Sequence, residues 1–364
     1  MHYNYIFCII MDISVFGDSN DGNITIACDV LGDSIVLEES SVKDILGIDI
    51  GYGDVKVIYG DSTGKISKIF KFPSAIGITK RNAYVADTRV LDYKDHSYYV
   101  GADALNLPSS NMVDVSEYKN LEYYAPLFLY HAMKQIGLTD APDYVVCGLS
   151  KAQIGNSGYF KEALETFEVN GKEYTGIKVS ILPQGAGSKI TVDTYGDEFP
   201  QHQKDMNAEN TFVGVDIGFN TVDIFLVMNG KTSPSLFEGI EHQGVMRVAQ
   251  ALATFIKETY GRDITLHEAK DALDSGVYKL RGQRHDIAKQ VFEIKQNYLK
   301  EIQELINSRY GDVLDKCDFV YLSGGGSVFF KDVDTTGFFR TPKKVPEFYN
   351  AIGFYLYGIQ HFDA

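Results

Sequence analysis

The sequence predicts a two-lobed α/β protein built around a duplicated strand–turn–strand unit. Its 364 residues exceed the roughly 100–200 residues of an ordinary domain, which favours two lobes. Segments with the composition of buried strands alternate with segments whose apolar residues recur at helical spacing. The third observation is a pair of similar segments that lie about half a chain apart.

The composition excludes several classes of protein. A hydrophobic content of 45% excludes a disordered chain. With 34 basic and 49 acidic residues the formal charge is −15, so we expect no direct contact with nucleic acid. No apolar run approaches the roughly 18 residues of a membrane span, so we expect no membrane contact. Cys8, Cys28, Cys147 and Cys317 are scattered, as suits the reducing cytoplasm.

The repeat consists of residues 46–56 (LGIDIGYGDVK) and residues 213–223 (VGVDIGFNTVD). Aligned without gaps, the two segments share five identities, and an aromatic residue follows the second glycine in both. The equivalent aspartates, Asp49 and Asp216, are 167 residues apart. Valine, isoleucine and phenylalanine flank each glycine-containing turn, so each copy predicts a hairpin between buried strands.

These hairpins have the chemistry of a phosphate site. Gly51 and Gly218 have no Cβ, so backbone amides can approach an anion. The carboxylates of Asp49 and Asp216 would repel a phosphate unless a cation lies between each carboxylate and the phosphate. Mg²⁺ is the usual cation, held by one or two carboxylates together with phosphate oxygens and waters. One copy alone would be an ordinary hairpin with aspartate in the turn, but two copies favour a clamp on a nucleotide tail.

A third glycine cluster follows an apolar strand, at Gly324, Gly325, Gly326 and Ser327. Such a loop lets a flat ligand, adenine or ribose, approach the backbone closely. A flexible turn is the alternative, because the motif is neither a Walker A loop nor a Rossmann fingerprint.

Two Asp-x-Gly hairpins half a chain apart, followed by a strand that ends in three glycines, resemble the actin-like ATPases. The pattern is most similar to the ParM/StbA-type proteins that segregate plasmids and to related archaeal and bacterial proteins. The resemblance covers residues 45–361. It implies a duplicated ribonuclease-H-like fold, with mixed sheets flanked by helices and a nucleotide cleft between the lobes. The implied divisions are an N-terminal extension of unknown role (1–44), lobe I (45–208 plus 343–364) and lobe II (209–342).

Three further segments carry the resemblance. Residues 144–150 resemble the family's strand ending in Gly-Leu-Pro, with Ser150 in place of the proline. Residues 177–185, ending in Leu-Pro-Gln-Gly, are similar to the connection that carries the hydrolytic glutamine or glutamate. Residues 348–355 resemble the C-terminal connecting helix. Asp54 departs from the pattern, and its carboxylate must point away from the phosphates or help to hold the metal.

The resemblance implies ATP, or GTP, as the ligand, with Mg²⁺ held largely through water by Asp49 and Asp216. It implies three catalytic residues, Gln184, Asp216 and Asp49, of which Gln184 orients the attacking water. Lys56 would balance charge on the β- and γ-phosphates. The expected nucleotide contacts are Gly51, Tyr52, Gly53, Lys56, Gly218, Phe219, Asn220, Thr221, Gly324, Gly325, Gly326 and Ser327.

Two functions are compatible with this resemblance, because a fold does not fix a function. The first is an ATPase that polymerises head to tail into dynamic filaments and segregates plasmid or other DNA through a DNA-binding adaptor of the ParR type. The second is a non-polymerising kinase or phosphohydrolase that acts on a small molecule.

Periodicity and capping signals predict helices over residues 119–136, 159–167, 243–260, 265–273 and 286–310, and an exposed loop over residues 196–210. Residues 19–23 predict a turn and residues 24–27 a strand.

Overall fold

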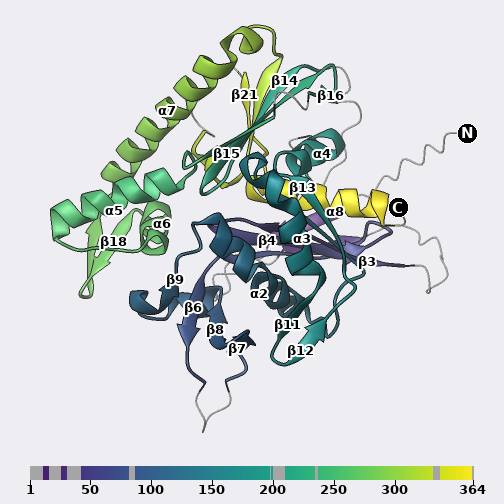
Figure 1. Ribbon diagram of the computed structural model, residues 1–364. Coiled ribbons are helices and arrows are strands. Elements are labelled where there is room, and N and C mark those ends of the chain that lie inside the picture. Colours follow the sequence, from purple (N-terminus) through teal and green to yellow (C-terminus); the bar gives the residue numbers. More distant parts are fainter. Residues whose placement is uncertain are drawn as a thin grey trace, which may run out of the picture. The chain divides into compact units, whose positions relative to one another are not determined.

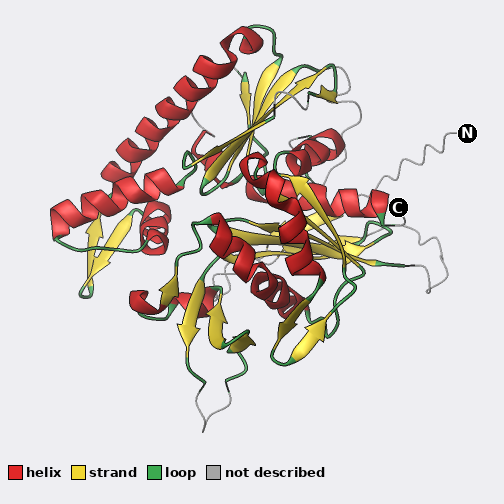
Figure 2. Ribbon diagram, in the orientation of Figure 1, coloured by secondary structure: helices red, strands yellow, loops and turns green. Residues whose placement is uncertain are grey.

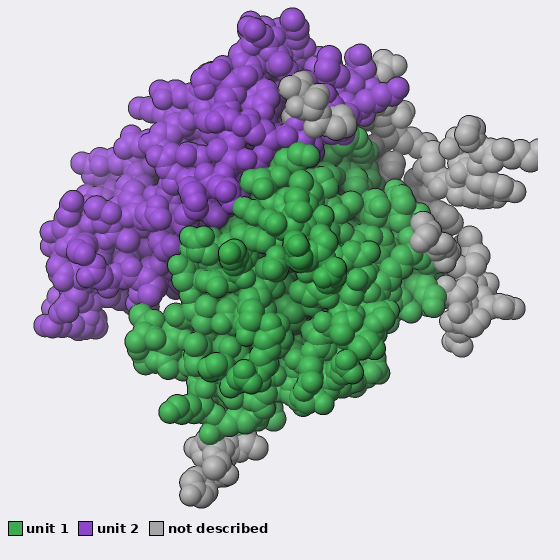
Figure 3. Space-filling model, viewed as in Figure 1, with its two compact units in different colours: residues 1–209, 342–364 green, residues 210–341 purple. Residues whose placement is uncertain are grey.

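The chain folds into two units (Figure 3). Each unit is organised around one mixed β-sheet with helices beside it (Figure 2). Unit 1 comprises residues 1–209 and 342–364, and unit 2 comprises residues 210–341. The computed structural model describes residues 11–15, 26–30, 42–81, 87–196, 198–199, 210–233, 237–330 and 337–362. The turn predicted at 19–23 lies outside the described residues, as does most of the loop predicted at 196–210.

The main sheet of unit 1 has the strand order β13-β10-β3-β4-β5. Its strands are β3 (Asp44–Ile50), β4 (Asp54–Asp61), β5 (Ile66–Pro73), β10 (Tyr144–Leu149) and β13 (Lys178–Pro183). The first three form an antiparallel meander, and β10 and β13 run parallel to β3. The hairpin predicted from the first repeat is therefore confirmed.

Alternation along β3 gives its two faces different neighbours. Leu46, Ile48 and Ile50 point into a core cluster that also contains the buried residues of α2 (Tyr118–Ile136). Gly47 lies on the opposite face, where α8 (Tyr349–His361) packs. A Cβ on Gly47 would be 2.6 Å from the amide nitrogen of Tyr355. Only glycine lets the backbone of α8 approach the strand this closely.

The two helices α4 (Ala186–Tyr195) and α8 also touch through their backbones. A Cβ on Gly353 would be 1.9 Å from the carbonyl oxygen of Gly187. A Cβ on Gly187 would be 2.6 Å from the carbonyl oxygen of Asn350. The segment of α8 predicted from its resemblance to a connecting helix is thus a buried helix of unit 1, held against α4 by paired glycines.

Smaller elements complete unit 1 (Figure 1). A four-stranded sheet has the order β7-β8-β6-β9, and two separate hairpins are β1–β2 and β11–β12. The strands are β1 (Met11–Val15), β2 (Ile26–Val30), β6 (Ile76–Thr79), β7 (Leu91–Tyr93), β8 (His96–Val100), β9 (Met112–Val113), β11 (Phe167–Val169) and β12 (Lys172–Tyr174). The helices are α1 (Ala102–Leu105), η2 (Ser109–Asn111), η3 (Lys151–Asn156), α3 (Ser157–Glu165) and η6 (Pro346–Phe348).

The main sheet of unit 2 has the order β16-β15-β14-β20-β21, with β17 also paired to β15. Its strands are β14 (Phe212–Ile217), β15 (Thr221–Met228), β16 (Lys231–Thr232), β17 (Glu238–Glu241), β20 (Phe319–Ser323) and β21 (Phe339–Arg340). The other elements are α5 (Met246–Tyr260), α6 (Leu266–Ser275), β18 (Val277–Leu280), β19 (Gln283–Asp286), α7 (Ala288–Leu314) and η5 (Gly325–Phe330). The hairpin predicted from the second repeat, β14–β15, is confirmed.

The faces of β14 also differ. Val213, Val215 and Ile217 join the core cluster shared with α5, α6 and α7. Gly214, two residues before Asp216, lies on the other face under the ring of Phe225. A Cβ on Gly214 would be 2.1 Å from the Cζ atom of that ring.

Most helix predictions hold, with shifted ends. Gly261 closes α5 in the left-handed conformation, and Thr265 with Glu268 forms the predicted capping box. The helix predicted at 159–167 ends at Glu165, because Thr166 has extended backbone and Phe167 begins β11. The helix predicted to end at Tyr310 continues to Leu314, past non-helical backbone angles at Tyr310. Within the described part of the chain, no helix combines the length and apolarity needed to cross a membrane.

We predict that Gly353→Ala destabilises the protein strongly, by about 3 kcal/mol, because α8 and α4 must separate to admit the new methyl group. The matched control is Gly311→Ala in α7, where a Cβ would meet no atom within 4 Å. This control should be neutral or should stabilise the protein by up to about 1 kcal/mol. Urea unfolding of both variants measures the difference, and equal stability would refute the close packing of α8.

Candidate functional site

In unit 1 the structure brings together three of the residues predicted from the sequence, Asp49, Lys56 and Gln184. Asp49 lies near the end of β3 and its side chain is buried. One carboxylate oxygen accepts a hydrogen bond of 2.8 Å from Nε2 of Gln184, and the other accepts one of 3.4 Å from Nζ of Lys56. The backbone N–H of Gln184 donates to the carbonyl of Leu149 at 2.7 Å, which fixes the segment after β13. Both oxygens of Asp49 therefore have a defined partner.

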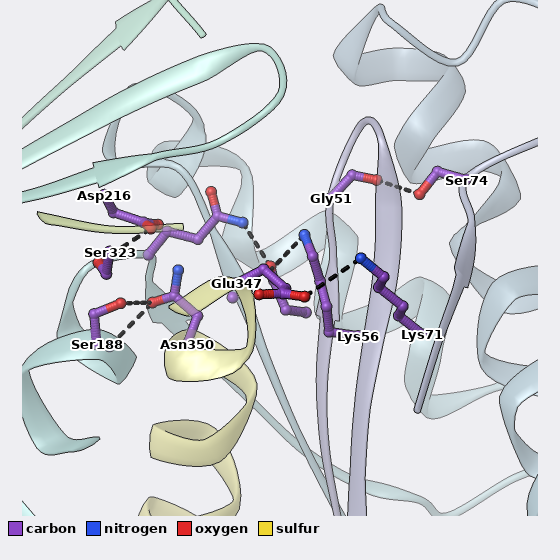
Figure 4. A network of polar contacts seen from close by, with 12 residues as sticks. Gly51, Lys56, Lys71, Ser74, Ser188, Asp216, Ser323, Glu347 and Asn350 are labelled. Atoms are coloured by element: carbon purple, nitrogen blue, oxygen red, sulfur yellow. Dashed lines mark hydrogen bonds and ion pairs between the residues drawn. The ribbon is translucent and has the colours of Figure 1, made fainter. Parts of the chain in front are cut away.

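A row of charged residues crosses three strands at this point. In the sheet register Asp49 lies opposite Lys56, and Lys56 lies opposite Lys71 on β5. Nζ of Lys71 is 3.4 Å from a carboxylate oxygen of Glu347, just before α8 (Figure 4). Lys71 and Glu347 were not predicted as site residues. Lys71 could have been found only by placing β5 in register with β4.

Ser74 braces the first hairpin turn, which contains Gly51, Tyr52 and Gly53. Its hydroxyl donates to the carbonyl oxygen of Gly51 (Figure 4). Its backbone N–H donates to the carbonyl oxygen of Gly53 at 3.0 Å. In a trans peptide the carbonyl and the next N–H point in opposite directions, so the N–H of Tyr52 is directed away from Ser74.

The side chains around this turn differ in burial. The ring of Tyr52 packs against the core of unit 1. A Cβ on Gly51 would lie 3.0 Å from the carbonyl oxygen of Asp54, so glycine avoids a tight contact inside the turn. Asp54 begins β4 opposite Pro73, and its side chain is half-buried.

The second hairpin turn is braced by the segment that begins α5. The N–H of Gly218 donates to the carbonyl of Thr221 at 2.9 Å and closes the turn. Three successive amides then bind the turn carbonyls: Val245 donates to Gly218 at 3.0 Å, Met246 to Phe219 at 2.7 Å and Gly244 to Asn220 at 3.1 Å. A Cβ on Gly244 would be 2.4 Å from the carbonyl oxygen of Phe219. The N–H groups of Phe219 and Asn220 are consequently directed away from this segment.

The side chains of the second hairpin form buried contacts of their own. Oδ1 of Asn220 lies 3.1 Å from Nδ1 of His242, to which the sequence assigned no role. The hydroxyl of Thr221, one of the expected nucleotide contacts, donates to Asp223 at 3.1 Å. Asp223 lies directly opposite Asp216, at the place where the first hairpin has Lys56 opposite Asp49. Alignment of the two repeats could have revealed this exchange of a lysine for an aspartate.

The third glycine cluster lies against the side chain of Asp216. One oxygen of the buried Asp216 carboxylate accepts a hydrogen bond of 3.2 Å from the hydroxyl of Ser323 (Figure 4). Gly324 has a φ of 82°, and a Cβ there would be 2.5 Å from the same oxygen. Gly325 is exposed and would meet no atom within 4 Å. The hydroxyl of Ser327 donates to the carbonyl of Gly324 at 2.7 Å, so the cluster folds into the first turn of η5.

A residue that sequence reasoning missed, Asn350 of α8, fixes the segment that follows Gln184. Its buried side-chain oxygen accepts hydrogen bonds from the N–H of Gly185 at 2.9 Å and from the N–H and hydroxyl of Ser188 at 3.1 and 3.2 Å (Figure 4). Three donors on one oxygen hold the start of α4 in place. Asn350 and Gln184 are 166 residues apart, so no local pattern connects them.

Asp49 in unit 1 and Asp216 in unit 2 are each a buried carboxylate of the kind that can hold Mg²⁺ beside a phosphate. The described residues contain no group of three or more side chains that could hold a metal by themselves. Mg²⁺ does not need such a group, because one or two carboxylates suffice when phosphates and waters supply the other ligands. Each aspartate lies beside a glycine turn, as this arrangement requires.

The thiol of Cys147, on the strand next to β3, takes no part in this chemistry. Burial raises its pKa to about 12, so the thiol stays protonated and unreactive at neutral pH.

Two family models match the chain. Residues 47–187 match the N-terminal domain of actin-like proteins, and residues 214–333 match the C-terminal part of archaeal MreB-like actin homologues. Together the two segments span more than two thirds of the chain. No curated protein sequence matches it.

Solved structures of actin-like proteins share the fold. The archaeal actin homologue Ta0583 in complex with ADP is 21% identical, with a TM-score of 0.67. A non-polymerisable pCBH ParM mutant is 19% identical, with a TM-score of 0.67, and a ParM from Clostridium botulinum in a 15-stranded filament is 17% identical, with a TM-score of 0.65. Each likeness covers 87% of this chain and 99% of the other. With its two family matches, the chain belongs to the actin-like ATPase superfamily, and it shares its fold with ParM proteins and the archaeal actin homologue Ta0583.

Proposed function

We propose that this protein binds magnesium and ATP and hydrolyses the ATP to ADP and phosphate. The observation that carries the proposal is the bracing of both hairpin turns. Ser74 and the start of α5 bind the turn carbonyls, so amides of each turn point the other way, as an anion requires. The archaeal homologue in complex with ADP supports a nucleotide as the ligand. GTP could replace ATP, because these turns contact phosphates and not the base.

We propose the following roles for the residues in binding Mg²⁺ and the nucleotide. Asp49 and Asp216 would hold Mg²⁺ largely through water, and the ion would neutralise phosphate charge. Lys56 would balance charge on the β- and γ-phosphates. Amides of Gly51, Tyr52, Gly53, Phe219 and Asn220 would bind phosphate oxygens, whereas Gly218, whose N–H closes the second turn, would let the phosphate approach. The cluster from Gly324 to Ser327 would accommodate the nucleoside.

Gln184 is the residue that we propose orients the attacking water. An amide is too weak a base to take a proton from water, so its contribution is positional. Because Nε2 of Gln184 donates to Asp49, its side-chain carbonyl oxygen is turned elsewhere and can accept a hydrogen bond from a water. This contact fixes the amide before any nucleotide arrives.

We further propose that the protein polymerises head to tail in the cytoplasm and segregates DNA through a basic adaptor of the ParR type. A head-to-tail contact does not close on itself, so it generates a helical filament. The ParM filament of the same fold supports assembly. The net charge of −15 supports a separate DNA-binding partner.

We predict that Gln184→Ala lowers the turnover of ATP about 10²-fold, because the water loses its positioning group. Nucleotide affinity should change by less than about threefold. The control is Gln250→Ala, an exposed glutamine on α5, which should leave turnover unchanged. Steady-state phosphate release and binding of a fluorescent ATP analogue measure the two effects. Normal turnover in the Gln184→Ala protein would exclude this role.

We predict that the purified protein sediments with Mg²⁺ and ATP but stays in the supernatant with ADP, because the proposed contact forms in the ATP state. Electron microscopy of the pellet should show filaments. Hydrolysis of ATP by a protein that stays monomeric at high concentration would contradict polymerisation. That result would favour the kinase or phosphohydrolase.

A further inference from the structure

The row of charged residues in unit 1 places two lysines side by side. Lys56 of β4 lies directly opposite Lys71 of β5, and Asp49 of β3 lies opposite Lys56, so the three side chains share one face of the sheet. This is the face on which α8 packs, because Gly47, two residues before Asp49, lies against α8. Like charges directly opposite each other across two strands repel. The sheet thus retains an unfavourable pair of lysines beside the proposed phosphate site.

Each of the two lysines pairs with a different carboxylate. Nζ of Lys56 is 3.4 Å from a carboxylate oxygen of Asp49, and Nζ of Lys71 is 3.4 Å from one of Glu347 (Figure 4). The exposed fractions of these four side chains lie between 5% and 24%. Because salt and water screen partly buried charges less than exposed ones, the four charges influence one another. Removal of one of them should change the contacts of the others.

Lys56 is the lysine of this row that reaches the first hairpin turn. A Cβ on Gly51 would lie 3.1 Å from Nζ of Lys56. In the second hairpin the equivalent position is acidic, since Asp223 lies opposite Asp216, and Gly239 lies opposite Asp223. The positive charge that we propose for the β- and γ-phosphates therefore depends on where the ammonium group of Lys56 lies.

Glu347 is a carboxylate that could draw Lys56 away from the turn. Its present partner, Lys71, is on the strand next to Lys56, and neighbouring strands lie about 4.8 Å apart, which is less than the length of an extended lysine side chain. Without Lys71, the partly buried carboxylate of Glu347 would lose its ion pair, and Lys56 is the neighbouring lysine of the row. With Lys71 in place, Glu347 is occupied and the ammonium group of Lys71 repels that of Lys56.

We propose that Lys71 is a positioning residue for the phosphate site, which keeps the ammonium group of Lys56 at the first hairpin turn by occupying Glu347 and by repelling Lys56. This inference rests on the proposed binding of ATP. Lys71 acts through Lys56 and stays paired with Glu347. The role predicts an asymmetry between the two partners, because loss of Lys71 releases a competitor for Lys56, whereas loss of the Glu347 charge removes that competitor.

The test is a double-mutant cycle that comprises Lys71→Gln, Glu347→Gln and the two changes together. The matched control is Lys68→Gln, which removes the same charge from an exposed lysine on the same strand. Titration with a fluorescent ATP analogue and Mg²⁺ measures the dissociation constant of each variant. Urea unfolding of the same proteins measures their stability.

We expect Lys71→Gln to weaken binding of the ATP analogue at least about tenfold, because Lys56 loses a charge-assisted contact with phosphate. Glu347→Gln, the double variant and the Lys68→Gln control should stay within about threefold of the unchanged chain, because in each the contact of Lys56 remains. An ion pair with a purely structural role would give the two single variants equal effects, and that result would overturn the proposal. A double variant that binds as weakly as Lys71→Gln would also overturn it.

An exchange of the two residues tests the role without leaving a charge unpaired. The variant Lys71→Glu with Glu347→Lys keeps an ion pair between β5 and η6 but places a carboxylate directly opposite Lys56. It should bind the ATP analogue at least about tenfold more weakly than the unchanged chain, with similar stability in urea. Unchanged affinity in this variant would contradict the role of Lys71. If the unchanged chain itself binds no ATP, the proposed function fails and this role with it.

Discussion

The close approach of α8 to its neighbours is the constraint on which the rest of unit 1 depends. Gly47 of β3, Gly148 of β10 and Gly187 of α4 each lie where a Cβ would meet the backbone or an aromatic ring of α8. Because these glycines admit the helix, Asn350 reaches the start of α4 and fixes the peptide that follows Gln184. Gln184 is then held against Asp49. Packing of glycines in the core thus determines the geometry of a polar site at the end of β3.

Unit 2 uses the same turn with a different support and a different charge. Its Asp216 follows Gly214 on a strand face covered by the ring of Phe225, and its hairpin is braced by the start of α5. The residue opposite the aspartate is Lys56 in one unit and Asp223 in the other. The duplication has therefore kept the backbone of the turn while the charge beside each aspartate has diverged. Under the proposed function, positive charge for the phosphates comes from unit 1.

Local signals in the sequence were sufficient for the parts of the fold that depend on neighbouring residues. The repeated Asp-x-Gly pattern predicted β3–β4 and β14–β15, and Gly261 and the capping box at Thr265 predicted helix ends. The helix after Gln184 was not predicted, because α4 begins at a glycine and is fixed by Asn350 from the far end of the chain. Gly244 and Ser74 were missed for the same reason, since each braces a turn that is distant in sequence. Hydrogen bonds between residues far apart in the sequence produce no periodic pattern from which they could be predicted.

The central proposal is that ATP binds at both hairpin turns and at the third glycine cluster. Backbone hydrogen–deuterium exchange with and without Mg²⁺ and ATP tests it directly. The account predicts slower exchange at residues 51–54, 218–221 and 324–327 over the same range of ATP concentration, while the Asn170–Gly171 turn of β11–β12 is unchanged. Protection at only one hairpin, or at neither, would contradict the account.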